Sequence, residues 1–273
     1  MTAWDPERYL TYSDERARPF VDLLRRVDAD RPKTVVDLGC GPGNLTALAA
    51  GRWSEARVVG LDSSAPMIDK ARSTIDGVDF AVADLRDWAD SVVPGSVDVL
   101  LSNATLQWVP GHLDLLPALA GAVGKGGWFA FQVPGNFDEP SHRLREELAA
   151  EDPYAEHTRH PSTSSGHRLE APGSHDPADY YDVLVGEGFE VDAWETTYLH
   201  VLTGEDPVFT WIAGTSLRPT AAALEKAGLF EPFAEELKNR LARAYPVRND
   251  SVGNSFVLLP FRRVFVVARR LAA

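Results

Sequence analysis

The most constraining feature of this chain is the stretch Val35–Gly43, whose sequence is VVDLGCGPG. An apolar pair leads into Asp37 and then into three glycines at alternate positions, which predicts a buried strand ending in a tight loop. Glycine permits positive φ and has no Cβ, so a ligand can lie against bare backbone in such a loop. The residues from Asn44 onward can begin a helix whose free N–H groups face that ligand.

The glycine spacing distinguishes two classes of nucleotide site. In the dinucleotide fingerprint G-x-G-x-x-G/A, a small residue stands where this chain has Asn44. Here Gly43 continues the alternation begun by Gly39 and Gly41. This variant resembles the nucleoside-binding loop of class I S-adenosylmethionine-dependent methyltransferases, whose ligand has no pyrophosphate. The alternative is a glycine-rich turn that binds no ligand.

Composition limits the environment and the partners of the chain. Its 273 residues are 44% hydrophobic, enough for one large domain with a core or one domain with an insertion. No apolar run is long enough to cross a bilayer, and Met1–Pro6 lacks the pattern of a signal peptide. Cys40 is the only cysteine, so no internal disulfide can form, and we expect a cytoplasmic protein. The net charge of -13 argues against nucleic acid as a partner and slightly favours a monomer.

Apolar runs alternate with helical patterns along the first half of the chain. Strands are predicted at residues 34–37, 57–61, 78–83, 97–101 and 127–133, and helices at 13–27, from 66 and at 113–123. This alternation predicts βαβ units and an α/β fold with a mostly parallel sheet. Later strands at 190–201 and 256–269, the second bent at Pro260, are expected to form an antiparallel edge, with short helices at 207–245 between them.

The resemblance to class I methyltransferases implies a Rossmann-like fold with a seven-stranded sheet, an antiparallel edge strand and a small helical insertion. We expect a single methyltransferase domain over residues 1–273. Its expected parts are a helical cap at 1–32, a cofactor-binding βαβ core at 33–135, a helix and mobile loop at 136–189, and final strands at 190–273 that carry the helical insertion at about 206–246. Residues 151–177 are rich in Pro, Ser, Gly and His, and loops of that length are either functional lids or mobile insertions.

Polar residues follow the ends of successive predicted strands. Asp37, Asp62, Asp84 and Asn103 all stand at or just past such ends. Ligands of parallel sheets bind beyond the carboxyl ends of the strands, so we expect these side chains to share one site. Asp62 lies about 20 residues past the glycine loop, where a carboxylate can accept both hydroxyls of a ribose. Its alternative role is to cap the helix that begins near Pro66, which the adjacent serines could do instead.

Two further assignments follow from the family resemblance. In class I methyltransferases an acid placed like Asp84, followed here by Leu85, receives the exocyclic amine of adenine; the alternative is a plain strand-end turn. The loop of residues 103–108 faces the reacting centre in that fold, and Gln107 and Trp108 can offer an amide and an indole wall. The alternative is that Trp108 packs in the core. This loop lacks the Asn/Asp-Pro-Pro-Tyr/Phe sequence of enzymes that methylate amino groups of nucleic acid bases or glutamine.

Longer motifs make the resemblance closer. The patterns DLGCGPGN-x-T, G-x-DSS-x-x-MI, NA-x-LQW, an opening W-x-P-x-x-Y, W-x-TTY-x-H, GT-x-LRP and FRR-x-F-x-VARR together resemble trans-aconitate 2-methyltransferases over nearly the whole chain. The stretch Tyr154–His175 departs from that pattern because it is longer and more polar. The resemblance implies S-adenosyl-L-methionine as the cofactor, bound by Asp37, Gly39, Gly41, Asn44, Asp62, Ser63, Met67, Asp84, Leu85, Asn103, Gln107 and Trp108.

The implied reaction transfers a methyl group from the cofactor to one carboxylate of trans-aconitate and gives a monomethyl ester. An ionised carboxylate is already a nucleophile, so alignment is the main task, and we expect no catalytic general base. The histidines of the polar loop show no metal-ligand spacing, so we expect no metal.

A polyanionic tricarboxylate requires cations, and the arginine fork matches a carboxylate. The candidate substrate residues are Arg218, Arg262, Arg16, Tyr198, Tyr180 and His200. Surface arginines that balance an acidic protein are the alternative. The competing functions are methylation of another small carboxylic acid or hydroxyl compound, a nicotinamide-dependent oxidoreductase, and a module that senses the cofactor without reacting.

Overall fold

The computed structural model describes residues 17–158, 173–214 and 216–272. Its contacts divide the chain into two compact units. The first unit takes its described residues from 1–134, 170–196 and 263–273, and the second takes them from 135–169 and 197–262. None of the described helices is both long enough and apolar enough to span a membrane.

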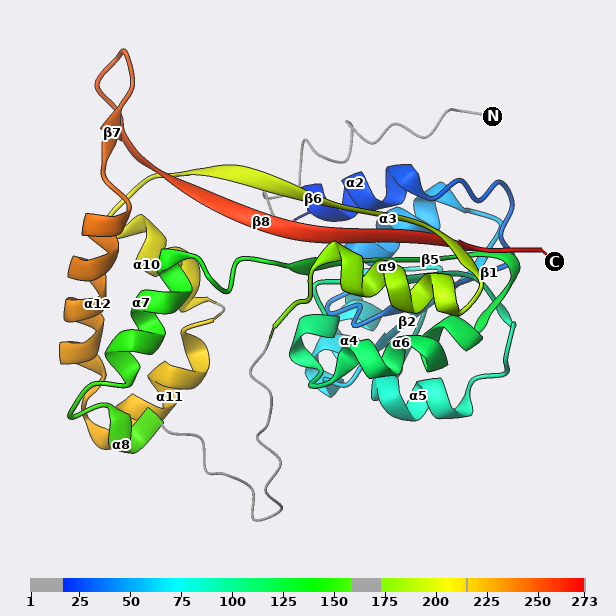
Figure 1. Cartoon of the computed structure of the whole chain (residues 1–273), viewed down its shortest axis with the longest axis horizontal. Helices are drawn as coiled ribbons and strands as arrows, with labels where there is room; N and C mark the ends of the chain where they lie inside the picture. Colours follow the sequence, from blue (N-terminus) through cyan, green and yellow to red (C-terminus); the bar gives the residue numbers. More distant parts are fainter. Residues whose placement is uncertain (1–16, 159–172, 215, 273) are drawn as a thin grey trace. The chain divides into compact units, whose positions relative to one another are not determined.

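The first unit is a sheet with helices on both of its faces (Figure 1). Its helices are α2 Arg18–Arg26, α3 Asn44–Arg52, α4 Ala65–Thr74, α5 Leu85–Ser91, the short 3₁₀ helix η1 Leu106–Trp108, α6 His112–Gly121 and α9 Pro177–Gly186. Its strands are β1 Thr34–Leu38, β2 Arg57–Asp62, β3 Asp79–Val82, β4 Val97–Asn103 and β5 Val123–Pro134, with parts of β6 Phe189–Leu202 and β8 Ser255–Arg270.

The strands lie in the order β3-β2-β1-β4-β5-β8-β6. β1 pairs in parallel with β2 and β4, β2 with β3, and β4 with β5, whereas β8 runs antiparallel to β5. These pairings confirm the α/β fold with a mostly parallel sheet. Among the described residues the sheet has eight strands rather than the expected seven, because the two-residue strand β7 (Arg248–Asn249) pairs with β8 outside this order. The antiparallel strand is β8, which lies between β5 and the edge strand β6.

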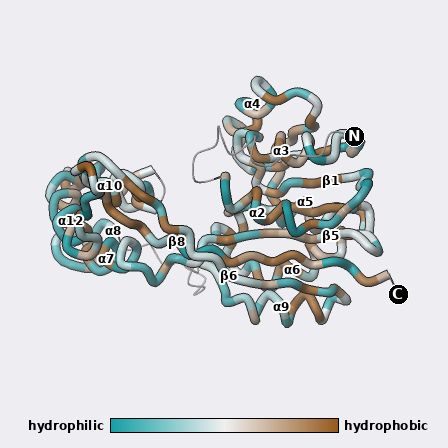
Figure 2. The backbone as a smooth tube through the Cα atoms, turned by 90° about the horizontal axis from the view of Figure 1, so that it is seen from above, coloured by the Kyte–Doolittle hydropathy of each residue, from teal (hydrophilic) through white to brown (hydrophobic). Residues whose placement is uncertain are grey.

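Apolar strands allow helices to cover both faces of the sheet. Figure 1 shows α2 and α3 on one face and α5, α6 and α9 on the other. On the second face, buried residues of α6 and α9 such as Leu119 and Leu184 join Leu100 and Phe129 of the strands in one core cluster. Figure 2 shows the matching pattern of hydropathy, with hydrophobic stretches along the strands of this unit.

The strand β5 begins earlier than the sequence predicts, at Val123 rather than Gly127. Glycines at 124, 126 and 127 resemble a turn, and a register shift between Val97 and Val99 of β4 accommodates them. A Cβ at Gly124 would lie 2.8 Å from the carbonyl oxygen of Gly95, so close approach of the backbones explains that glycine.

The second unit is mainly helical and contains α7 Pro140–Ala149, α8 Ala155–Thr158, α10 Pro207–Ala213, α11 Arg218–Ala227, α12 Phe230–Ala244 and the short strand β7 Arg248–Asn249, with the remaining parts of β6 and β8. Its core gathers Phe233, Leu237 and Leu241 from one face of α12. The spacing of these residues is that of an amphipathic helix. The predicted helices at 207–245 belong to this unit, and α8 lies within the stretch expected to be a loop, of which residues 159–172 are outside the described structure.

Asp37 ties β1 to α3 through a buried hydrogen bond. The residue is 2% exposed, and its carboxylate accepts the hydroxyl of Thr46 at 2.6 Å. Burial raises the pKa of Asp37 from 3.8 to about 6, the Thr46 bond opposes this rise, and the charge of Asp62 adds to it. The folded chain therefore binds a proton at Asp37 more readily than the unfolded chain does between those two pH values.

Phe80 of β3 fills the space above two glycines. A Cβ at Gly60 would lie 2.6 Å from the Phe80 ring, and one at Gly43 would lie 2.7 Å from it. Phe80 also packs with Ile68 and Cys40 in a small core cluster. Glycine usually weakens the interior of a strand. At position 60 it is required because a side chain would collide with the Phe80 ring.

We expect Gly60→Ala to lower the free energy of unfolding by about 1–3 kcal/mol, because the methyl group must displace a buried aromatic ring. Gly121→Ala is the matched control, since a Cβ there has open space at the end of α6 and alanine favours helix. Urea denaturation measures both. A Gly60→Ala protein as stable as the unmodified chain would contradict this packing.

We expect Asp37→Asn to change how stability depends on pH. As the pH rises from 3.8 to about 6, Asp37 ionises in the unfolded chain first, so its burial costs the folded chain up to about 3 kcal/mol. The amide that replaces the carboxyl does not ionise, so the variant should gain stability relative to the unmodified chain across this window. Denaturation at a series of pH values measures the difference, and parallel curves would show that Asp37 does not titrate this way.

Candidate functional site

A cavity of about 470 Å³ lies at the carboxyl ends of β1, β2, β3 and β4 in the first unit. This volume is typical of small-molecule sites, which span about 300–1,000 Å³. Its walls come from the residues that end these strands and from the loops that follow them. The lining residues are Leu38, Gly39, Leu61, Asp62, Ser63, Ala83, Asp84, Leu85, Arg86, Ala104, Thr105, Trp108 and Val109.

The glycine loop combines a packed position with an open one. Gly39, Gly41 and Gly43 all have positive φ, at 73°, 56° and 82°. A Cβ at Gly39 would lie 2.0 Å from Oγ1 of Thr105, so this glycine lets the loop approach the end of β4. A Cβ at Gly41 would meet nothing within 4 Å, which leaves bare backbone beside open space. Cys40 packs with Ile68 and Phe80 in a small core cluster, and burial raises the pKa of its thiol to about 12.

Asp62 holds two backbone segments while it lines the cavity. Its Oδ2 accepts the N–H of Gly41 at 2.9 Å, and its Oδ1 accepts the N–H of Ser64 at 2.8 Å. Ser64 is the N-cap residue of α4, and its own side chain makes no capping bond. Asp62 therefore fixes the glycine loop against the start of α4. Each carboxylate oxygen has a further lone pair that can accept a ligand hydroxyl.

Asp84 is the N-cap of α5. Its Oδ1 accepts the N–H of Arg86 at 2.8 Å, which forms the strand-end turn that was the alternative to adenine binding. Asp84 also lines the cavity, so the turn and a ligand contact are compatible. Arg86 in turn donates to the carbonyl oxygen of Pro110 at 2.7 Å. This bond joins the start of α5 to the loop after η1, so both sides of the cavity rim are tied together.

The loop after β4 has a strained residue at its centre. Ala104 has a φ of 53°, which is unusual for a residue with a side chain. Its N–H donates to the carbonyl oxygen of Gln132 at 2.9 Å, and its carbonyl oxygen accepts Nε2 of Gln107 at 2.6 Å. These two bonds hold the conformation, and the buried Oε1 of Gln107 has no hydrogen-bond partner among the described residues.

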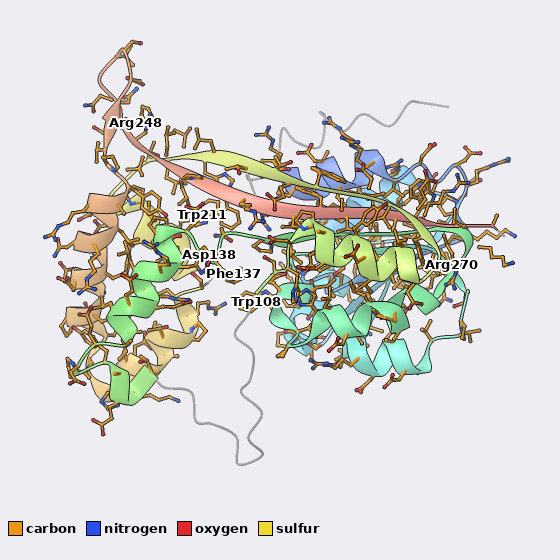
Figure 3. All side chains as sticks on the ribbon, in the orientation of Figure 1. Trp108, Phe137, Asp138, Trp211, Arg248 and Arg270 are labelled. Carbon is orange, nitrogen blue, oxygen red and sulfur yellow. The ribbon has the colours of Figure 1, made fainter. Side chains whose placement is uncertain are left out.

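Trp108 is 53% exposed and contributes to the cavity wall, so it does not pack in the core (Figure 3). The chain just before α9 contacts the same 3₁₀ helix, because the N–H of Gly173 donates to the carbonyl oxygen of Gln107 at 3.1 Å. The position of η1 is therefore fixed from two sides.

The structure places the predicted cofactor residues in two groups. Gly39, Asp62, Ser63, Asp84, Leu85 and Trp108 line the cavity. The others do not: Asp37, Gly41, Asn103 and Gln107 bond to the wall or its supports, while Asn44 and Met67 are exposed. Sequence reasoning missed the apolar wall of Leu38, Leu61 and Ala83. Each of these is the last apolar residue at a strand end, directly before the glycine loop or an aspartate. This position in the sequence could have identified them.

The predicted substrate residues are more scattered. Arg218 is exposed at the start of α11, and Arg262 donates to the carbonyl oxygen of Gly135 at 3.2 Å. Tyr198 and His200 are 3% and 5% exposed, and His200 packs against the ring of Trp211. All four belong to the second unit. Arg16 lies outside the described residues.

Among the described residues, Tyr180 is the predicted substrate residue of the first unit. It is fully buried, and its hydroxyl lies 2.8 Å from Nε2 of His112 and accepts the N–H of His175 at 3.1 Å. Burial raises the pKa of Tyr180 to about 12. These contacts join α9 to α6, and they give no support to a contact of Tyr180 with substrate.

Comparisons with known proteins agree with this geometry. Residues 9–171 match a family model described as a methyltransferase domain. Among solved structures, phosphoethanolamine N-methyltransferase 2 of Haemonchus contortus in complex with S-adenosyl-L-methionine has the same fold, with a TM-score of 0.52 at 16% identity over 93% of this chain and 52% of that one.

Curated relatives match over nearly their whole length. A trans-aconitate 2-methyltransferase of Mycobacterium sp. (strain KMS) is 49% identical over 97% of this chain and 99% of its own. One from Streptomyces avermitilis is 47% identical over 99% of this chain and 98% of its own. Identity at this level over nearly the whole chain shows that the chain belongs to the trans-aconitate 2-methyltransferase family of methyltransferases.

Proposed function

We propose that this protein transfers a methyl group from S-adenosyl-L-methionine to one carboxylate of trans-aconitate and forms a monomethyl ester. The observation that carries the proposal is the 49% identity, over nearly the full chain, with a relative named trans-aconitate 2-methyltransferase. The cavity at the carboxyl edge of the sheet supports it independently, because this edge is where parallel sheets bind ligands.

The residues of the cavity fit an adenosine-bearing cofactor. Asp62 and Asp84 supply acceptors for ribose hydroxyls and for an exocyclic amine, and Trp108 supplies an aromatic wall. Two groups outside the cavity lining support this fit: a Cβ at Gly41 would meet open space, and the buried Oε1 of Gln107 has no hydrogen-bond partner among the described residues. The acidic residues also favour a ligand with positive charge.

S-adenosyl-L-methionine supplies an electrophilic methyl group on a sulfonium; a carboxylate oxygen takes the methyl carbon, and the pair of electrons of the broken C–S bond stays on sulfur. The protein needs no base for this step, because the attacking oxygen carries no proton at neutral pH. What the chain contributes is alignment, through a loop fixed by Asp62 and a wall fixed by Gln107.

The comparisons argue more strongly against one alternative function than against the other. A nicotinamide-dependent oxidoreductase is disfavoured because the relatives are methyltransferases and Asn44 interrupts the dinucleotide fingerprint. Methylation of another small acid is the closer competitor. Substrate binding by Arg218, Arg262, Arg16, Tyr198, Tyr180 and His200 stays a prediction.

We expect the purified full-length protein to transfer labelled methyl from S-adenosyl-L-methionine to trans-aconitate in preference to other di- and tricarboxylates and to small hydroxyl compounds. The product should release labelled methanol in alkali, as an ester does. Labelling of a different acid with higher kcat/KM, or of no acid at all, would contradict the proposed function.

We expect Asp62→Asn to weaken the binding of S-adenosyl-L-homocysteine by about 10- to 100-fold, because an amide cannot accept both the backbone N–H groups and the ribose hydroxyls. Asp69→Asn, an exposed change on α4, is the control and should leave binding unchanged. Calorimetry measures the affinity, and a thermal melt checks that each variant is folded. If the folded Asp62→Asn protein binds S-adenosyl-L-homocysteine as tightly as the unmodified protein does, Asp62 only supports the glycine loop and does not bind the ribose.

A further inference from the structure

The carboxylate that receives the methyl group has to lie at the cavity of the first unit. Reacting atoms must approach to about 3–3.5 Å before a group is transferred, so an oxygen of this carboxylate must come that close to the methyl carbon. The cavity is the proposed site of the cofactor that carries this carbon. Whatever holds the rest of the acceptor, the side chains that contact the reacting carboxylate therefore belong to the cavity lining or to its rim.

Strand order indicates which part of the lining faces the sulfur of the cofactor. The strands lie in the order β3-β2-β1-β4, with Asp84 directly after β3 and Asp62 at the end of β2. With adenine at Asp84 and ribose at Asp62, the nucleoside runs from β3 toward β1. The sulfur is attached to the ribose on the side away from adenine, so it lies toward the ends of β1 and β4. A donor for the reacting carboxylate is therefore expected near these two strands.

The segment from Thr105 to Pro110, which follows β4, forms the wall on this side. It begins against the glycine loop, because a Cβ at Gly39 would lie 2.0 Å from Oγ1 of Thr105. It ends at Pro110, whose carbonyl oxygen accepts Nη2 of Arg86 at 2.7 Å. Trp108 stands between these two anchors and lines the cavity. Its indole therefore belongs to the wall between the end of β1 and the start of α5.

Side-chain donors are few among the described lining residues. They belong to Ser63, Arg86, Thr105 and Trp108. Ser63 and Arg86 follow β2 and β3, on the adenosine side of the cavity. The hydroxyl of Thr105 bonds to two backbone carbonyl oxygens, each at 3.3 Å. The indole N–H of Trp108 can only donate, and it makes none of the hydrogen bonds found among the described residues. Trp108 therefore supplies the available donor on the sulfur side.

Trp108 is both accessible and firmly positioned. The residue is 53% exposed, so a ligand can reach the edge of the ring. The backbone of η1 is held because the N–H of Trp108 donates to the carbonyl oxygen of Thr105 at 2.9 Å and the N–H of Gly173 donates to that of Gln107 at 3.1 Å. A tryptophan side chain has only two rotatable bonds, so fixing it costs little conformational entropy. An indole offers an apolar face and a polar N–H at different places on one rigid ring.

We propose that Nε1 of Trp108 donates a hydrogen bond to the carboxylate of the acceptor that receives the methyl group. This inference deepens the proposed function and rests on it. The face of the ring keeps its place in the wall of the cofactor site, and the N–H binds the acceptor. One carboxylate oxygen is held by the indole. The other oxygen forms the bond to the methyl carbon, while the electron pair of the broken C–S bond stays on sulfur.

A neutral donor suits a carboxylate that must react. A guanidinium pairs more strongly with a carboxylate than a neutral N–H does. The carboxylate loses its charge in the transition state, so strong pairing would stabilise the reactant more than the transition state and would slow the transfer. A single N–H from Trp108 orients the carboxylate with a smaller penalty of this kind. The bond also weakens when the ester forms, because the product oxygen carries no charge, and this favours release of the product.

The test compares the full-length protein with Trp108→Phe, Trp108→Leu and the control Trp128→Phe. Phenylalanine keeps an aromatic face and removes the N–H, whereas leucine removes both. Trp128 is outside the cavity lining and lies opposite Arg269 of β8, and Figure 3 shows the next residue, Arg270, far from Trp108 within the first unit.

Calorimetry gives the dissociation constant of S-adenosyl-L-homocysteine and, with that ligand present at saturation, the dissociation constant of trans-aconitate. Steady-state kinetics give KM and kcat for both substrates. A thermal melt checks that each variant is folded.

Trp108→Phe should raise the dissociation constant and the KM of trans-aconitate by about 10- to 100-fold, because a hydrogen bond to a charged group is lost. The affinity for S-adenosyl-L-homocysteine and the kcat should each stay within about threefold, because the aromatic face remains and the bond contributes little in the transition state. Trp108→Leu should weaken the binding of both ligands. Trp128→Phe should match the unmodified protein.

Two results for the folded Trp108→Phe protein would overturn the inference. One is an unchanged affinity for trans-aconitate, and the other is an equal loss of affinity for both ligands, because the ring would then act only as a wall. If Trp108→Phe does not fold, Trp108→Leu decides. A loss for trans-aconitate no larger than the loss for S-adenosyl-L-homocysteine would then overturn the inference.

The outcomes separate this inference from the proposed function. If the unmodified protein methylates trans-aconitate and the folded Trp108→Phe protein binds it equally well, the inference is wrong and the function stands. If the unmodified protein binds trans-aconitate without methylating it, the proposed function fails, and the calorimetric comparison still decides the role of Trp108. If it does not bind trans-aconitate at all, both fail.

Discussion

The parallel pairing of β1 with β2 on one side and β4 on the other is the constraint on which the candidate site depends. Pairing in this direction brings the carboxyl ends of the strands to one edge, so loops from distant parts of the sequence meet there. The close approach of Gly39 to Thr105 and the carboxylate of Asp62 then fix these loops against each other. The cavity is the space that remains between them.

The same side chains brace the loops and line the cavity. Asp62 holds Gly41 and Ser64, and Asp84 caps α5, so both carboxylates are positioned before any ligand arrives. Preorganisation of this kind reduces the entropy that binding must overcome. From the sequence, Asp62 and Asp84 could each either cap a helix or turn, or bind a ligand. In the structure one carboxylate can do both.

Sequence alone predicted the sheet, the glycine loop and the polar strand ends, because apolar runs and glycine spacing are local patterns. It placed β5 too late because glycines at 124–127 resemble a turn, and the backbone contact with Gly95 that requires one of them is not local. It could not show that Arg263 shares a strand face with Gln132, because the face of a strand depends on its register with β5. The arginine network with Gln132 and Asn103 depends on strand order, which no single segment encodes.

The central claim is that a nucleoside binds in the cavity beside Asp62 and Asp84, with the methyl acceptor next to it. A crystal structure of the full chain with S-adenosyl-L-homocysteine and trans-aconitate tests it most directly. We expect ribose hydroxyls within hydrogen-bond distance of Asp62 and a carboxylate of trans-aconitate aimed at the sulfur. Clear density for the nucleoside outside the cavity, or for trans-aconitate with no carboxylate near the sulfur, would contradict this claim.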